Sequence, residues 1–193
     1  MFKNIIKFGQ EMMVQGLNNS HSGNVSCRQG NIIHITRHGA RLGDLSCGDF
    51  VAVNLKDDKK DKNASIEIMV HRAIYLVNPD VQAIVHAHPP VAIALSLNLK
   101  KIIPIDAEGS YYLPEIPILT KCKEVISSNC VAENIPQFFK TYKVVVVRGH
   151  GSFAVGKNFE EAYLYTSVLE SASKIIALNK IVHLAKDCGI AKI

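Results

Sequence analysis

Residues 81–88, with the sequence VQAIVHAH, form a short β-like run that ends on two histidines and is closed by Pro89 and Pro90. Such a run predicts a strand, because β-branched residues favour extended backbone and proline interrupts it. Side chains two residues apart on a strand project from the same face, so His86 and His88 can reach one ion together. The run therefore predicts a strand that presents two possible metal ligands.

A third histidine follows the clearest strand of the sequence, the four valines at 144–147. His150 belongs to the turn Gly149-His150-Gly151, whose glycines leave space around the ring. Three neutral imidazoles with one open position are the ligand set of a catalytic zinc site, whereas structural zinc sites are closed by cysteines. We therefore predict one Zn²⁺ per subunit, held by His86, His88 and His150. Cobalt, manganese and iron are alternatives on ligand type alone.

The remaining periodicities predict an α/β domain in which helices cover one sheet. Apolar residues at helical spacing predict helices over 2–17, 65–77, 91–97 and 160–185. Short β-like runs predict strands over 31–36, 50–55, 81–88, 102–105, 143–147 and 152–155. Residues 23–26 and 148–151 are predicted as turns, 56–64 as a charged loop, and 106–118 as loop and strand edges.

Glu67 is the candidate proton-transfer residue. It lies four residues before His71 on the predicted helix, so the two share a helix face. Its neighbours Ile66 and Ile68 indicate burial, which would raise the pKa of the carboxyl into a range useful for a general base. Two plainer explanations stay open: an acidic residue also suits a helix N-terminus, and His71 either orients Glu67 or simply packs.

Length and composition fit one domain over residues 1–193, with 48% hydrophobic and 20% charged residues. The apolar stretches fall far short of the ~18 residues of a membrane span, and the N-terminus lacks a signal-peptide pattern. We therefore expect a cytoplasmic protein with no membrane partner. Five scattered cysteines, odd in number, favour reduced thiols. The net charge is +5, but much of the positive charge lies in the lysines at 56–62, which are interleaved with aspartates. This mixture predicts a solvated loop and no nucleic-acid partner.

These motifs, in their order and spacing, resemble the class II aldolase and adducin-head family over almost the whole chain. The matching segments are Gly23-Asn24-Val25-Ser26, Thr36-Arg37-His38-Gly39, Ser65-Ile66-Glu67 with His71, residues 84–88, Asp106-Ala107-Glu108-Gly109, and Gly149-His150-Gly151 to Gly156. The resemblance implies a layered α/β/α domain with a central, mostly antiparallel sheet. It also implies a homotetramer with active sites at subunit interfaces.

The resemblance also implies a reaction and roles for the residues. The reaction is the reversible cleavage of a ketose 1-phosphate, such as L-fuculose 1-phosphate, to dihydroxyacetone phosphate and an aldehyde. Zinc would be bound by the three histidines, and Glu67 would be the catalytic acid/base. Tyr111, Tyr112 or Glu108 would handle the proton of the departing aldehyde, from a neighbouring subunit. The implied phosphate pocket consists of Gly23, Asn24, Thr36, His38, Gly39 and Ser65.

Two departures from the family pattern affect the phosphate pocket. Thr36-Arg37-His38-Gly39 stands where Thr-Pro-Thr-Gly is usual, and Ser65-Ile66-Glu67 where Ser-Ser-Glu is usual. Each lost hydroxyl removes a donor worth roughly 0.5–1.5 kcal/mol, unless Arg37, His38 or Arg41 compensates with charge. The substrate therefore stays open. A sugar-phosphate epimerase, a dehydratase and a non-catalytic binding module of the adducin-head type are the alternatives.

Overall fold

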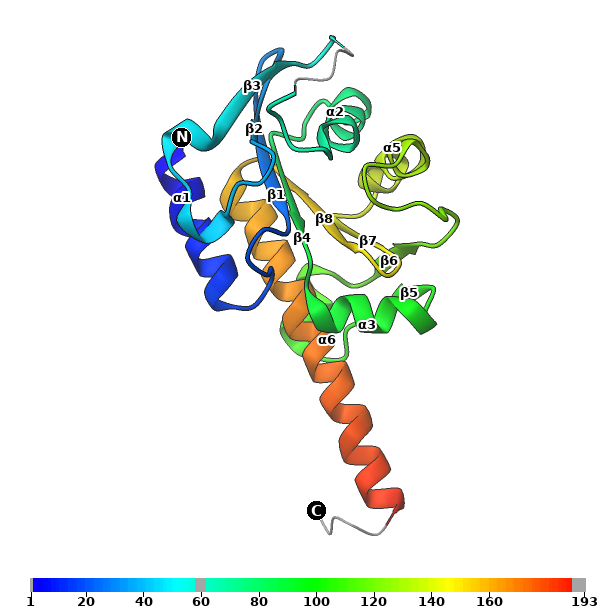
Figure 1. Ribbon diagram of the computed structural model, residues 1–193. Helices are drawn as coiled ribbons and strands as arrows, with labels where there is room; N and C mark the ends of the chain where they lie inside the picture. Colours follow the sequence, from blue (N-terminus) through cyan, green and yellow to red (C-terminus); the bar gives the residue numbers. More distant parts are fainter. Residues whose placement is uncertain (1, 58–61, 189–193) are drawn as a thin grey trace.

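The computed structural model describes residues 2–57 and 62–188, and its centre is a single twisted sheet (Figure 1). The described residues form eight strands in the order β3-β2-β1-β4-β8-β7-β6-β5. The strands are β1 (Asn24–Gln29), β2 (Ile32–Thr36), β3 (Phe50–Asn54), β4 (Ala83–Ala87), β5 (Lys101–Ile102), β6 (Ile116–Leu119), β7 (Val144–Val147) and β8 (Gly151–Gly156). Neighbouring strands run antiparallel except β6 and β7, which are parallel. The predicted α/β class with a mostly antiparallel sheet is confirmed.

Helices cover both faces of this sheet. They are α1 (Phe2–Val14), α2 (Ile68–Val77), α3 (Pro90–Asn98), α4 (Ala107–Tyr112), α5 (Asn129–Asn134) and α6 (Phe159–Asp187), with 3₁₀ turns at Leu42–Asp44, Cys47–Asp49 and Pro136–Lys140. Helices α2 and α5 pack on one face, and α1, α3 and α6 pack on the other (Figure 1). The result is the α/β/α layering that the family resemblance implies.

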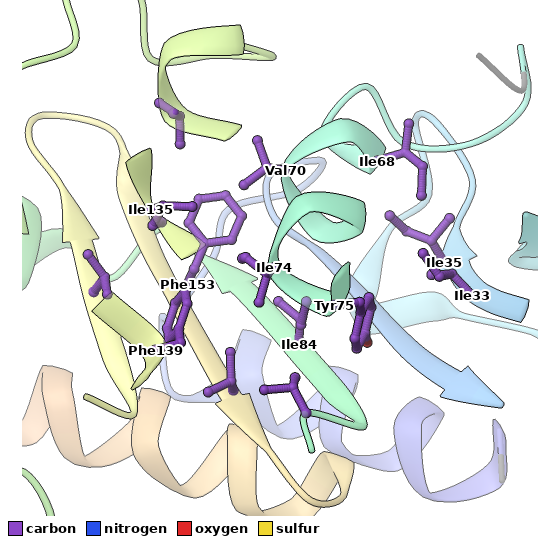
Figure 2. Close-up of a cluster of buried hydrophobic side chains, with 14 of the residues drawn as sticks. Ile33, Ile35, Ile68, Val70, Ile74, Tyr75, Ile84, Ile135, Phe139 and Phe153 are labelled. Carbon is purple, nitrogen blue, oxygen red and sulfur yellow. The ribbon is translucent and has the colours of Figure 1, made fainter. Parts of the chain in front are cut away.

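Strand β7 shows why a run of valines can sit in the middle of such a sheet. Val145 and Val147 join the core under α2, while Val144 and Val146 join the core under α6. Because successive side chains point to opposite faces, a strand covered on both sides needs apolar residues at every position. Figure 2 shows the α2 side of this core, where Ile74 points toward Phe153 and Ile84 of the sheet.

The alternation of strand β4 fixes which side of the sheet carries the histidine pair. Ala83, Val85 and Ala87 pack toward α1 and α6, and Ile84 packs toward α2. His86 follows Ile84 in the period of two, and its ring stacks on Phe153 of the α2-side core, with centroids 4.2 Å apart. The histidines therefore lie on the face of the sheet that α2 covers.

Several predicted boundaries are wrong, each for a local reason. Residues 24–26 belong to β1 rather than to a turn. Of the strand predicted over 102–105, only Ile102 lies in a strand, the two-residue β5 (Lys101–Ile102). The segment 106–118, predicted as loop and strand edges, runs into strand β6 but also contains helix α4. This helix begins where the Asp106 side chain accepts the N–H of Gly109 at 2.8 Å. Helix α5 was not predicted from the sequence. The charged loop predicted over 56–64 falls partly on residues 58–61, which lie outside the described residues.

The prediction of reduced thiols is wrong for one pair. Cys122 and Cys130 form a disulfide that closes the segment between β6 and α5. Among the described residues, Cys27, Cys47 and Cys188 form no disulfide. In the described part of the chain, none of the helices is both long enough and apolar enough to cross a membrane.

Candidate metal centre and active site

Three histidines converge where β4 ends. His86 lies in β4, His88 follows it, and His150 occupies the tight turn between β7 and β8, which β8 places beside β4 through the Ala87–Ser152 register. Their ligand atoms all lie within 4.8 Å of one another. A glycine at position 151 is needed here, because a Cβ would stand 2.5 Å from the Ala87 carbonyl oxygen and 2.7 Å from His88 Cδ2.

The ring nitrogens are arranged as a set of metal ligands. His86 Nδ1 lies 3.0 Å from the Ser152 carbonyl oxygen, an acceptor, so Nδ1 carries the hydrogen and Nε2 keeps its lone pair. That Nε2 lies 3.0 Å from His88 Nε2, and His150 Nδ1 is buried with no hydrogen-bond partner among the described residues. Three nitrogen donors with one ring oriented by a carbonyl fit a divalent ion.

Burial keeps these imidazoles neutral. It lowers the pKa of His86 far below its ordinary value, with the neighbouring histidines adding to the effect, and it lowers the pKa of His88 in the same direction. Burial, helped by His88, also lowers the pKa of His150 to about 4. Neutral imidazole is the form that binds metal, so the site is ready for an ion at neutral pH.

Glu67 is buried immediately before α2, with 3% of its surface exposed. The backbone N–H of Ser127 donates to Oε1 at 2.8 Å, whereas Oε2 is buried with no partner among the described residues. Burial raises the pKa of this carboxyl, and the Ser127 hydrogen bond opposes part of that rise. The predicted burial and pKa direction of Glu67 thus agree with the structure.

The predicted pairing of Glu67 with His71 on one helix face is corrected by the helix boundary. Helix α2 begins at Ile68, so Glu67 occupies the cap position rather than the helix. His71 Nδ1 instead lies 2.7 Å from the hydroxyl of Ser26, which also lies 2.9 Å from the Tyr75 hydroxyl. Complete burial lowers the pKa of His71 to about 3. His71 is therefore a neutral core residue tied to β1.

Strand pairing and hydrogen bonds connect β4, which carries His86, to Glu67 through the predicted phosphate segments. Asn24 of β1 is the register partner of His86 in β4. The next residue, Val25, donates its N–H to Thr36 Oγ1 at 3.2 Å, and the Thr36 carbonyl accepts the N–H of Ser65 at 3.1 Å. Ser65 Oγ accepts the N–H of Glu67 at 3.3 Å. Asn24, Thr36 and Ser65 are buried, so the fold brings these predicted residues together with the site.

The other residues of the predicted phosphate pocket are Gly23, His38 and Gly39. Gly23 has a φ of +78°, and a Cβ there would stand 2.5 Å from Asn18 Oδ1, the atom that accepts the His88 N–H at 3.0 Å. Asn18 is a supporting residue that its place in a polar run did not reveal. His38 and Gly39 are exposed, and Arg37 is paired with Asp49 at 2.7 Å.

The three candidates for the second proton-transfer group lie elsewhere in the subunit. Tyr111 and Tyr112 end α4 with 80% and 37% of their surface exposed, and their rings touch each other at 5.0 Å. Glu108 is exposed in the first turn of the same helix. Helix α4 packs against α6 through Gly109. In the described part of the chain, no hydrogen bond or ring contact joins these residues to the imidazoles.

Comparison with known proteins agrees with this geometry. Residues 3–177 match the Class II Aldolase and Adducin N-terminal domain family. The chain belongs to this family.

Individual relatives include both enzymes and adducins. An L-fuculose phosphate aldolase of Methanococcus maripaludis is 34% identical over 169 residues, covering 85% of this chain and 87% of the relative. The crystal structure of L-fuculose-1-phosphate aldolase from Thermus thermophilus is 33% identical, with a TM-score of 0.89 and 94% of both chains covered. Rat alpha-adducin is 29% identical over 73% of this chain, which spans 20% of that protein. The full-length matches thus support an aldolase.

Proposed function

We propose that this chain is a zinc-dependent class II aldolase that reversibly cleaves a ketose 1-phosphate, such as L-fuculose 1-phosphate, to dihydroxyacetone phosphate and an aldehyde. The observation that carries the proposal is the convergence of three neutral imidazoles on the sheet face covered by α2, together with a buried Glu67. Hydrogen bonds connect Glu67 through Ser65 and Thr36 to β1, the strand that pairs with β4. A module kept only for binding would have no need of both this donor set and a buried carboxyl.

His86, His88 and His150 would hold the zinc. When bound, the ion supplies Lewis-acid chemistry at the ketose carbonyl and its adjacent hydroxyl, which makes the neighbouring carbon–carbon bond easier to break. The His86 ring would keep its orientation because its Nδ1–H donates to the Ser152 carbonyl. The backbone N–H of His88 donates to Asn18 Oδ1 and holds the main chain that carries the second ligand.

Glu67 would move the proton at the carbon atom from which the aldehyde departs. Burial raises the pKa of this carboxyl, so it can hold a proton nearer to neutral pH than an exposed glutamate. In cleavage it would give that proton to carbon, and in condensation it would remove it. Oε1 is held by Ser127, which leaves Oε2 as the free oxygen.

The phosphate group would lie against Gly23, Asn24, Thr36, His38, Gly39 and Ser65. Asn24, Thr36 and Ser65 would form the buried wall of this pocket, and His38 the exposed side. Because Arg37 is already paired with Asp49, Arg41 with its charge and His38 with its ring N–H would replace the lost hydroxyls.

We further propose that the single domain over residues 1–193 assembles as a homotetramer. The exposed Tyr111, Tyr112 or Glu108 of one subunit would then act on the aldehyde oxygen in the site of its neighbour. Their exposure in one subunit supports this arrangement, because residues that complete a neighbour's site must lie on the surface of their own.

A product assay tests the proposed function. Purified protein with measured zinc content is incubated with a panel of ketose 1-phosphates, including L-fuculose 1-phosphate, and released dihydroxyacetone phosphate is coupled to NADH oxidation. Zinc-dependent release supports the aldolase. An epimerised or dehydrated product without aldehyde assigns the sister reactions, and a protein that binds no zinc and turns over nothing assigns an adducin-like role.

A further inference from the structure

The segment between β6 and α5 reaches back to the catalytic carboxyl. Cys122, in this segment, is joined by the disulfide to Cys130 in the first turn of α5, and Cys122 and Val125 pack on the core under α2. Inside this ring lies Ser127, which has a φ of +49°. Non-glycine residues seldom adopt this left-handed backbone, and where they do the conformation is set by surrounding contacts.

Ser127 makes two short hydrogen bonds to the residues that precede α2. Its backbone N–H donates to Glu67 Oε1 at 2.8 Å, and its hydroxyl donates to the carbonyl of Ile66 at 2.8 Å. The following residue, Ser128, caps α5 by accepting the N–H of Val131. The left-handed conformation of Ser127 is therefore held between a helix cap, a disulfide ring and two bonds to the segment carrying Glu67.

We propose that Ser127 is the positioning residue for Glu67: its backbone N–H fixes Oε1, so that Oε2 is the atom that exchanges the proton, and the Cys122–Cys130 disulfide keeps this N–H in place. The proposal rests on the function proposed above. It assigns a role to a residue that acts through its backbone and to a disulfide that the metal site does not otherwise need.

The chemistry follows from the asymmetry of the carboxylate. Oε2 has no hydrogen-bond partner among the described residues, so it is free to face a carbon-bound proton. A charged hydrogen bond to Oε1 also stabilises the carboxylate form, which limits how far burial raises the pKa of Glu67. Loss of the donor would therefore move the titration of Glu67 to higher pH.

Two substitutions at one position isolate the backbone N–H. Ser127→Gly and Ser127→Pro both lose the hydroxyl, but glycine keeps the N–H and accepts a positive φ, whereas proline has no N–H and a φ near −65°. We expect Ser127→Pro to have kcat lower than Ser127→Gly by about tenfold, with KM changed by less than about twofold. Its pH profile for deuterium exchange into dihydroxyacetone phosphate should shift upward, and its bound zinc should equal that of wild type. Equal kcat and equal pH profiles in the two variants would overturn the proposal.

The disulfide is tested without touching Ser127. The control protein carries Cys47→Ser and Cys188→Ser, which remove both exposed free thiols and leave Cys122–Cys130 intact. Adding Cys122→Ser and Cys130→Ser to it should lower kcat about tenfold at similar KM, and reduction of the control protein should do the same. Unchanged kinetics after loss of the disulfide would contradict its role.

A readout that needs no turnover separates this proposal from the proposed function. Amide hydrogen exchange at Ser127 is measured in wild type, Glu67→Gln and Glu67→Ala. The amide should exchange at least about tenfold faster in Glu67→Ala, which has no acceptor, than in Glu67→Gln, whose carbonyl oxygen accepts. Equal protection in both variants would overturn the positioning role even in an active enzyme, and a protein that cleaves no sugar phosphate would still give this result if Ser127 holds Glu67.

Discussion

The end of β4 and the outer face of α4 both carry residues that the sequence nominates for chemistry, but the fold treats them in opposite ways. His86, His150 and Glu67 are all buried. The His86 ring bonds to the Ser152 carbonyl, the His150 ring packs against the other two imidazoles, and Glu67 accepts the N–H of Ser127. On α4, the rings of Tyr111 and Tyr112 pack edge to face, and Tyr111 leaves 80% and Tyr112 37% of its surface exposed.

The difference separates the part of the proposed active site that one subunit forms alone from the part that we propose a neighbouring subunit supplies. A metal centre needs neutral ligands, which burial of the imidazoles supplies before any ion arrives. A group that acts on the departing aldehyde can be exposed in its own subunit if it completes the site of a neighbouring subunit. The first region is therefore preorganised within the chain, and we propose that the second acts across the interface.

Loss of one imidazole should have the largest effect on the buried region. In His88→Ala two nitrogen ligands remain, so bound zinc should fall below about a tenth of the protein and activity should be lost with it. Metal analysis after dialysis measures this, and His183→Ala, at an exposed position on α6, is the matched control. A full metal complement in His88→Ala would refute the three-histidine site.

Glu67→Gln should remove the proton transfer while leaving the metal. The amide has nearly the same shape and can still accept the Ser127 N–H, but it cannot exchange a proton at Oε2. General acid–base catalysis contributes roughly 10²–10⁴-fold, so kcat should fall by that factor at unchanged zinc content. Activity within about threefold of wild type would take Glu67 out of the reaction.

Mixed oligomers test the exposed region. A variant with Glu108→Gln, Tyr111→Phe and Tyr112→Phe should be nearly inactive, as should Glu67→Gln. If the second group comes from a neighbour, co-assembly of the two proteins should restore about a quarter of wild-type activity, since random pairing leaves that share of sites intact. Mixtures that stay at the level of the parent variants would place the second group in the same chain or at other residues. Single substitutions then identify which of the three residues acts.

Acid should lower the free energy of unfolding of the metal-free protein, and this is the smallest of the effects predicted here. The pKa values of His71, about 3, and His150, about 4, lie below the ordinary value near 6.5, so the unfolded chain binds more protons than the folded chain in acid. The free energy of unfolding should then decrease as pH drops from about 6.5 to 4, by up to ~1.4 kcal/mol per pH unit for each imidazole. Urea unfolding in chelator should show a shallower pH slope in His71→Gln, whereas exposed His183→Gln keeps the wild-type slope. Equal slopes in all three proteins would contradict this account.

The parts of the molecule that could be predicted from sequence are those where side-chain periodicity carries the information. The period of two placed His86 and His88 on one face of a strand, and the glycines around His150 marked the turn that brings it near. The order of these motifs was specific enough to imply the family and, through it, the mostly antiparallel sheet. The long helix predicted over 160–185 also corresponds to α6 (Phe159–Asp187).

Short or doubly buried elements gave no such signal. Helices α4 and α5 have six residues each, too few for a helical period to be seen, and their caps, Asp106 and Ser128, are common turn residues. The first four residues of β1 are all buried, which removes the alternation expected of a half-exposed strand. Pattern reasoning therefore predicted loops where the core needs short elements.

The contacts that hold Glu67, the Ser127 N–H and the nearby disulfide, could not be predicted for a different reason. Ser127 acts through a backbone N–H, which every residue except proline carries, so its type says nothing about this role. The disulfide partners are eight positions apart with no paired motif, and only the fold of the segment between β6 and α5 brings them together. Supporting contacts of this kind become visible only when the chain is folded.

Solvent deuterium exchange into dihydroxyacetone phosphate tests the central claim most directly, because it isolates the proton transfer assigned to Glu67 from the choice of aldehyde. The zinc-loaded protein should exchange a carbon-bound hydrogen of this compound, and Glu67→Gln with the same zinc content should not. Exchange at the wild-type rate in Glu67→Gln, or no exchange by the fully zinc-loaded wild type, would contradict the assignment of this site as a class II aldolase centre.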